Sequence, residues 1–100
     1  MVSETFDPDA WRRIDSAGPF SDITYRRARS VPAVRIAIDR TRVRNAFRPE
    51  TVHELPVALQ HAKLHADVAA VILTGSGPSP NDGGWAFSAG GDHDVRGPER

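Results

Sequence analysis

The stretch Val68-Ala69-Ala70-Val71-Ile72-Leu73-Thr74 is a near-continuous apolar run that leads into Gly75-Ser76-Gly77. An apolar run of this length, bounded by turn residues, favours a buried parallel strand over a half-exposed one. A glycine-rich loop follows, Gly83-Gly84-Trp85-Ala86-Phe87-Ser88-Ala89-Gly90-Gly91, and ends at Asp92. Glycine lets a ligand approach the main chain closely, and N–H groups in such a loop can donate to an anion. The stretch therefore predicts a buried strand followed by an anion-binding loop.

The segment before this strand predicts a helix over Pro49–His65. Proline is a favoured first residue of a helix, and apolar residues recur at helical spacing from Val52 onward. Pro56 lies inside this segment, where its ring removes a backbone hydrogen bond, so we expect a bend there.

Two shorter segments, Asp22–Arg27 and Val34–Ile38, alternate between apolar and polar residues and predict strands. The connection Ala28–Pro32 is short enough to make them an antiparallel hairpin. The polar, arginine-rich segment Asp39–Phe47 predicts a loop. The order strand, helix, strand that follows predicts a right-handed βαβ unit, so the fold class is α/β.

Residues 1–20 mix proline, glycine and acidic residues, and we interpret them as an N-terminal leader with one helical turn near Asp9–Ile14. Residues 21–100 then form the folded domain. A chain of 100 residues suits one small domain of this kind.

Composition excludes several classes of function. The formal net charge is zero, which disfavours nucleic acid as a partner. There is no cysteine, so disulfides and thiolate chemistry are excluded. The N-terminus lacks the apolar core of a signal peptide, and the longest purely apolar run, Val68–Leu73, is too short to span a bilayer. We expect a cytoplasmic protein without a membrane partner.

Other motifs in the sequence are weak evidence for a particular function. The glycines do not complete a phosphate loop or a dinucleotide fingerprint, and on their own they could simply form turns. His61 and His65 have the spacing of a zinc pair, but no glutamate follows His61. A solvated helix face is the favoured interpretation, and we expect no metal site.

Two segments of the sequence, taken together, give a more specific indication of the class of protein. Val43-Arg44-Asn45-Ala46-Phe47-Arg48-Pro49 lies at a strand-to-helix connection, and Trp85-Ala86-Phe87-Ser88-Ala89-Gly90-Gly91-Asp92 follows the next strand. In this order they resemble the crotonase (enoyl-CoA hydratase/isomerase) superfamily, over about Trp11 to Gly97. The resemblance implies a crotonase-like ββα spiral fold. Residues 21–100 would be the N-terminal part of its acyl-CoA-binding domain, truncated and incomplete.

The resemblance also implies site residues. The backbone N–H of Gly91 would donate to a thioester oxyanion, a catalytic role that needs no side chain. Arg44 would lie near the phosphates of coenzyme A, although it could equally be a solvated loop charge. Asp92 could serve the acyl pocket or only tie the loop. The complete set of implied substrate and coenzyme A contacts is Val43, Arg44, Ala46, Ala89, Gly90, Gly91, Asp92 and His93.

By resemblance, the activity is that of a carbon–carbon lyase acting on an acyl-CoA thioester, with no bound cofactor and coenzyme A as part of the substrate. A hydratase or isomerase, or a non-catalytic acyl-CoA-binding piece, remain alternatives. The family's second oxyanion donor and its proton-transferring side chains lie further downstream. We therefore expect the isolated chain to be inactive. The full-length family implies a homo-oligomer, a trimer or hexamer.

Overall fold

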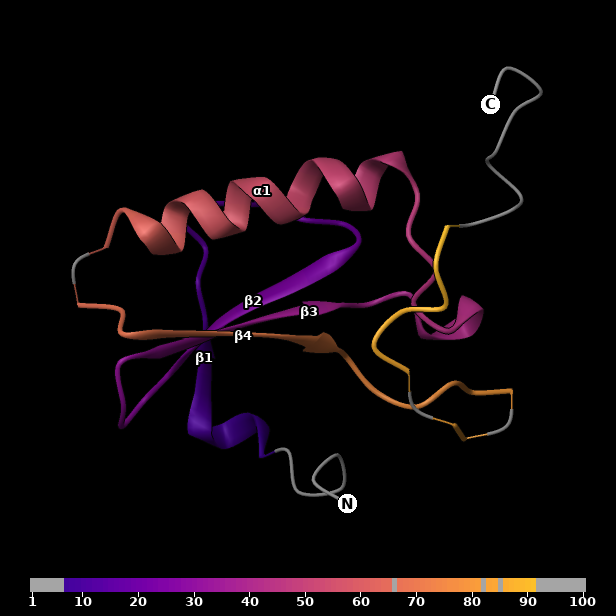
Figure 1. Cartoon of the computed structure of the whole chain (residues 1–100). Coiled ribbons are helices and arrows are strands. Elements are labelled where there is room, and N and C mark those ends of the chain that lie inside the picture. The colour runs from indigo at the N-terminus through magenta and orange to yellow at the C-terminus, as the bar shows by residue number, and fades with distance from the viewer. Residues whose placement is uncertain (1–6, 66, 82, 85, 92–100) are drawn as a thin grey trace.

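The computed structural model describes residues 7–65, 67–81, 83–84 and 86–91 (Figure 1). Over these residues it contains a sheet, a long helix and two short 3-10 helices. In chain order the elements are η2 (Pro8–Ala10), β1 (Trp11–Arg13), β2 (Ile23–Ala28), β3 (Ala33–Ile38), η3 (Thr41–Val43), α1 (Pro49–Lys63) and β4 (Ala70–Gly75).

The four strands form one sheet in the order β1-β2-β3-β4. The pairs β1–β2 and β2–β3 are antiparallel, whereas β3 and β4 are parallel, with Ile36 opposite both Tyr25 and Leu73. The helix α1 connects the two parallel strands and lies along one face of the sheet (Figure 1). The predicted hairpin, helix and parallel strand are confirmed, and the chain is a mixed α/β protein with a partial crotonase-like fold. The hand of the crossover stays a prediction.

The core lies between α1 and the central strands. Every residue of β3 is buried, and β2 buries Ile23, Tyr25 and Ala28. Ile23, Tyr25 and Ile36 pack against the small residues Ala58 and Ala62 of α1. Small residues on the inner face of the helix let it approach the sheet closely, so the larger strand side chains fill the space between the two layers.

The helical turn predicted at Asp9–Ile14 is wrong. Only Pro8–Ala10 is a 3-10 helix, and Trp11–Arg13 forms β1 on the edge of the sheet. Backbone hydrogen bonds extend this pairing at both ends, from the N–H of Ile14 to the carbonyl of Tyr25 and from the N–H of Arg29 to the carbonyl of Ala10. Residues interpreted as a leader therefore supply a strand, because pairing with β2 outweighs local propensity.

The prediction of a buried strand before the glycine loop is also wrong in one respect. The strand exists and pairs in parallel with β3, but Val71, Ile72 and Leu73 are each 43–44% exposed. The strand β4 lies at the sheet edge, and α1 packs mainly over β2 and β3. The apolar run is thus half-exposed in this structure, not buried as predicted.

Candidate functional site

The two segments that carry the family resemblance lie side by side. The N–H of Phe47 donates to the carbonyl of Gly90 at 2.8 Å, and the N–H of Ala89 donates to the carbonyl of Arg44 at 3.0 Å. Phe47 and Gly91 also form an isolated parallel bridge. Since these bonds join main chains, they place the glycine-rich loop against the arginine-rich loop whatever the nearby side chains do.

The conformation of this junction is unusual. Arg44 and Asn45 are consecutive non-glycine residues with positive φ, 53° and 58°, and Gly90 has a φ of 102°. Asparagine is among the residues that tolerate the left-handed region, whereas glycine adopts it without a Cβ penalty. The reversal that this produces ends η3 and redirects the chain toward α1.

Asn45 occupies the centre of the junction and is 1% exposed. Its Nδ2 donates to the carbonyl of Ala86 at 2.8 Å, and its Oδ1 accepts from the N–H of Arg40 at 2.8 Å. The hydroxyl of Ser88 donates to the carbonyl of Asn45 at 2.8 Å. The residue therefore joins the end of β3 to the glycine-rich loop.

Gly75, the last residue of β4, allows this close packing. A Cβ built on Gly75 would lie 2.0 Å from the carbonyl oxygen of Ala86 and 2.6 Å from Nδ2 of Asn45. Contacts this short do not occur with real Cβ atoms, so any side chain here would push the loop away. The absence of a side chain at Gly75 is a requirement of the site.

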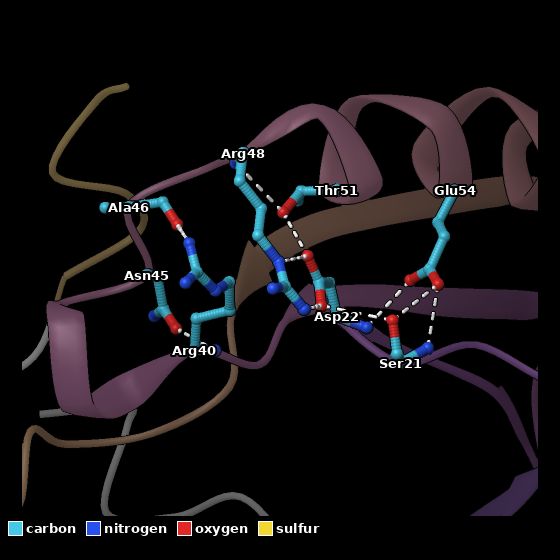
Figure 2. A network of polar contacts seen from close by, with 8 residues as sticks. All are labelled: Ser21, Asp22, Arg40, Asn45, Ala46, Arg48, Thr51 and Glu54. Atoms are coloured by element: carbon cyan, nitrogen blue, oxygen red, sulfur yellow. Dashed lines mark hydrogen bonds and ion pairs between the residues drawn. The ribbon is translucent and has the colours of Figure 1, made fainter. Parts of the chain in front are cut away.

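A polar network holds the start of α1 beside the junction (Figure 2). Arg48 donates to Asp22 through both Nε, at 2.8 Å, and NH2, at 2.6 Å. The hydroxyl of Thr51 donates to the same carboxylate at 2.6 Å and accepts from the N–H of Arg48 at 3.2 Å. The hydrogen bonds from Arg48, with those from Thr51 and Ser21, outweigh burial and hold the pKa of Asp22 well below its usual range. Asp22 is thus a buried anion.

Glu54 extends this network along α1. Glu54, one helical turn after Thr51, accepts from the N–H groups of Ser21 and Asp22, each at 2.8 Å. Within the arginine-rich loop, NH1 of Arg40 donates to the carbonyl of Ala46 at 2.6 Å (Figure 2). The start of α1 is therefore held to the start of β2, and the loop before α1 has a bond of its own across it.

An apolar cavity of about 420 Å³ opens beside the junction. Phe47 contributes to its wall from one segment and Phe87 from the other. The helix α1 supplies most of the remaining wall with Val52, Leu55, Pro56 and Leu59. A cavity of this size and composition suits an apolar group carried by a ligand whose polar part lies at the backbone junction.

The predicted site residues differ in their exposure to solvent. Val43, Arg44 and Ala89 are exposed, Ala46 is buried, and Gly90 and Gly91 are partly exposed. These residues belong to the two segments that the Phe47–Gly91 bridge joins, and their roles stay predictions. Asp92 and His93 lie outside the described residues.

Sequence reasoning missed Asn45 and the Asp22–Arg48 pair. For Asn45 a signal was available, since asparagine between polar loop residues is typical of a left-handed turn. Nothing in the sequence linked Asp22 to Arg48, because their contact spans 26 positions. Both features depend on tertiary structure.

Of the two histidines with zinc-pair spacing, His65 is exposed as expected, whereas His61 is not. His61 is partly buried, with Nδ1 at 2.8 Å from the hydroxyl of Tyr25 and Nε2 at 3.0 Å from the hydroxyl of Ser16. Burial, together with the neighbouring His65, lowers the pKa of His61. In the part of the chain that the structure describes, no group of three or more His, Cys, Asp or Glu side chains could hold a metal ion. Over the same residues, no helix is long and apolar enough to cross a membrane.

Sequence comparison identifies the class of protein. The profile of the enoyl-CoA hydratase/isomerase family matches residues 29–99, and the chain belongs to this family. The chain is also 54% identical over 97 residues to the 1,4-dihydroxy-2-naphthoyl-CoA synthase of Mycobacterium tuberculosis H37Rv, covering 97% of this chain. The enzyme of that name from Mycolicibacterium smegmatis is 54% identical over 97 residues, covering 92% of this chain. In both cases the match covers 31% of the relative, so the chain spans about a third of its relatives' length.

Proposed function

We propose that this chain is the N-terminal part of a 1,4-dihydroxy-2-naphthoyl-CoA synthase, which closes a ring in o-succinylbenzoyl-CoA during menaquinone biosynthesis. The observation that carries the proposal is the pairing of Arg44–Phe47 with Ala89–Gly91. The 54% identity to enzymes of that name supports this substrate over other acyl-CoA thioesters. The full enzyme would work in the cytoplasm as a homo-oligomer.

In this proposal each part of the junction receives a different part of the substrate. Val43 and Ala46 contact the nucleotide of coenzyme A, and the Arg44 guanidinium lies near its phosphates, which match its fork geometry. The N–H of Gly91 donates to the thioester oxygen as negative charge develops there. Ala89, Gly90, Asp92 and His93 adjoin the thioester. The apolar cavity beside Phe47 suits the aromatic ring of the acyl group.

The chemistry itself needs groups beyond these. Ring closure of this carbon–carbon lyase type requires removal of a proton from the succinyl side chain, followed by a Claisen-type attack of that carbon on the benzoate carboxyl carbon, whose oxygen leaves as water. The backbone donor at Gly91 stabilises the enolate but cannot remove the proton. We therefore expect the 100-residue chain alone to bind a thioester without turning it over.

Binding measured by calorimetry tests the proposal. The chain should bind acetyl-CoA, and Arg44→Ala should weaken binding about tenfold, the effect of one lost charge-assisted hydrogen bond. The matched control is Arg12→Ala, an exposed arginine on β1, which should leave affinity unchanged. Equal weakening in both variants, or no binding to the unsubstituted chain, would contradict the proposal.

Turnover assays separate the alternatives. We expect no product from o-succinylbenzoyl-CoA with the chain alone. Hydration of crotonyl-CoA would instead favour a generic enoyl-CoA hydratase. Binding of acetyl-CoA without any turnover, even after addition of the remaining part of a relative, would favour a non-catalytic acyl-CoA-binding role.

A further inference from the structure

We propose that Asn45 is a positioning residue that fixes the glycine-rich loop in the geometry that holds a thioester. This inference rests on the proposed function and deepens it. Asn45 is buried, and its amide bonds in two directions, accepting from the N–H of Arg40 and donating to the carbonyl of Ala86. A side-chain amide can accept and donate at once. An aspartate of the same shape lacks the donor, and an apolar residue lacks both.

A second route from Asn45 reaches the predicted oxyanion donor. The hydroxyl of Ser88 donates to the carbonyl of Asn45 at 2.8 Å and accepts from the N–H of Gly90 at 3.1 Å. Gly90 immediately precedes Gly91, whose N–H is the proposed donor. Asn45 thus holds the loop at two points, one near its middle and one beside the donor.

The backbone of Asn45 adds a third requirement. Its φ of 58° lies in the left-handed region, and its N–H donates to the carbonyl of Arg40 at 2.8 Å. Two substitutions separate these contributions. Asn45→Gly keeps the backbone preference and removes the amide, whereas Asn45→Asp keeps the shape and the contact to Arg40. In Asn45→Asp a carboxylate oxygen faces the carbonyl of Ala86, so the contact becomes repulsive.

Amide hydrogen exchange on the full 100-residue chain measures the position of the loop directly. In Asn45→Asp and Asn45→Gly, we expect the amides of Phe47, Ala89 and Gly90 to exchange about tenfold faster, with the β3 amides unchanged. The matched control, His53→Ala on the exposed face of α1, should change neither group. A merely structural role would accelerate the loop and β3 amides equally, which would overturn the proposal. Unchanged exchange at Ala89 would also overturn it.

Should Asn45→Asp and Asn45→Gly fail to fold, Ser88→Ala tests the same connection by removing one hydroxyl. The N–H of Gly90 bonds the deleted hydroxyl itself, so the informative amide is that of Phe47, which donates to the carbonyl of Gly90. Selectively faster exchange at Phe47 would support the proposal, and unchanged exchange there would overturn it. Calorimetry with acetyl-CoA then tests the proposed function and the positioning role of Asn45 separately. If the unsubstituted chain does not bind acetyl-CoA, the proposed function fails, while the exchange rates still decide whether Asn45 positions the loop. If it binds, about tenfold weaker binding by Asn45→Asp is expected, and unchanged affinity would overturn the proposal.

Discussion

Among single residues, Asp22 makes the densest set of polar contacts in the structure's described part. Its buried carboxylate accepts hydrogen bonds from Arg48, Thr51 and Ser21. The Arg48 side chain is 39% exposed, so the cost of replacing Asp22 comes from the lost hydrogen bonds to a charged acceptor, each of which contributes about 1.5–3 kcal/mol.

Asp22→Asn should therefore lower the free energy of unfolding by about 2 kcal/mol, because an amide nitrogen would face donors instead of accepting from them. Urea denaturation followed by circular dichroism measures this. His53→Ala, on the exposed face of α1, is the control and should stay within about 0.5 kcal/mol of the unsubstituted chain. A loss no larger than that of the control would contradict the importance of the Asp22 contacts.

Gly75→Ala tests the close approach of β4 to the loop. The new Cβ would lie 2.0 Å from the carbonyl oxygen of Ala86, so the loop must move, at a cost of about 2 kcal/mol. Gly83→Ala is the comparison, since no atom lies within 4 Å of its Cβ position and only its φ of 73° opposes the change. Faster amide exchange at Ala89 should appear in Gly75→Ala alone. Similar exchange in both variants would argue against the packing explanation.

The contrast between Gly91 and Asn45 shows what the sequence can reveal at this scale. The segment Gly90-Gly91-Asp92 is part of the family resemblance, and that resemblance implies a donor role for Gly91. The role of Asn45 rests on a contact with Ala86, 41 positions away, and on the missing side chain at Gly75. Such a role becomes visible only when the fold brings the segments together.

For the secondary-structure elements, prediction succeeded where local pattern and tertiary environment agree. The alternation of Asp22–Arg27 and the helical spacing after Pro49 correspond to β2 and α1. Prediction failed for β1, where Trp11–Arg13 carries two arginines and depends on pairing with β2. For β4, an apolar run indicates that a strand can be covered but not which element covers it.

Because β4 is exposed at the edge of the sheet, we expect copies of this chain to associate with one another. An edge strand with unpaired backbone groups and apolar side chains is a template for pairing with another chain. Ile72→Lys places a charge on a residue that is 44% exposed, so it should reduce association without destabilising the fold. Light scattering over a range of protein concentrations measures the apparent mass. Lys63→Ala, an exposed residue of α1 outside the strand, is the control, and equal association of the two variants would contradict this role.

At the scale of the whole molecule, stability should fall toward acid pH. The pKa of Asp22 is lowered from its ordinary value of 3.8, so its contribution is complete above that pH and is lost as the pH falls toward the folded-state value. His61, whose pKa is also lowered, acts in the same direction as the pH falls below its ordinary 6.5.

Urea midpoints measured at pH 7, 5 and 3 check this dependence. In Asp22→Asn the loss of stability below about pH 4 should become smaller, because the titrating group is gone. In His61→Gln the loss between about pH 7 and 5 should become smaller instead. An unchanged pH profile in Asp22→Asn would contradict the assignment of the acid-sensitive group.

The pairing of the two loops has a consequence for the order of folding. The hairpin of β2 and β3 joins neighbouring segments, whereas the bonds from Asn45 to Ala86 and Ser88 span 41 and 43 positions. Closing such long loops costs chain entropy that few contacts at the junction return. The junction should therefore form last as the chain folds and open first by local unfolding, while the sheet stays intact. A ligand that bridges both loops would add contacts that slow this opening.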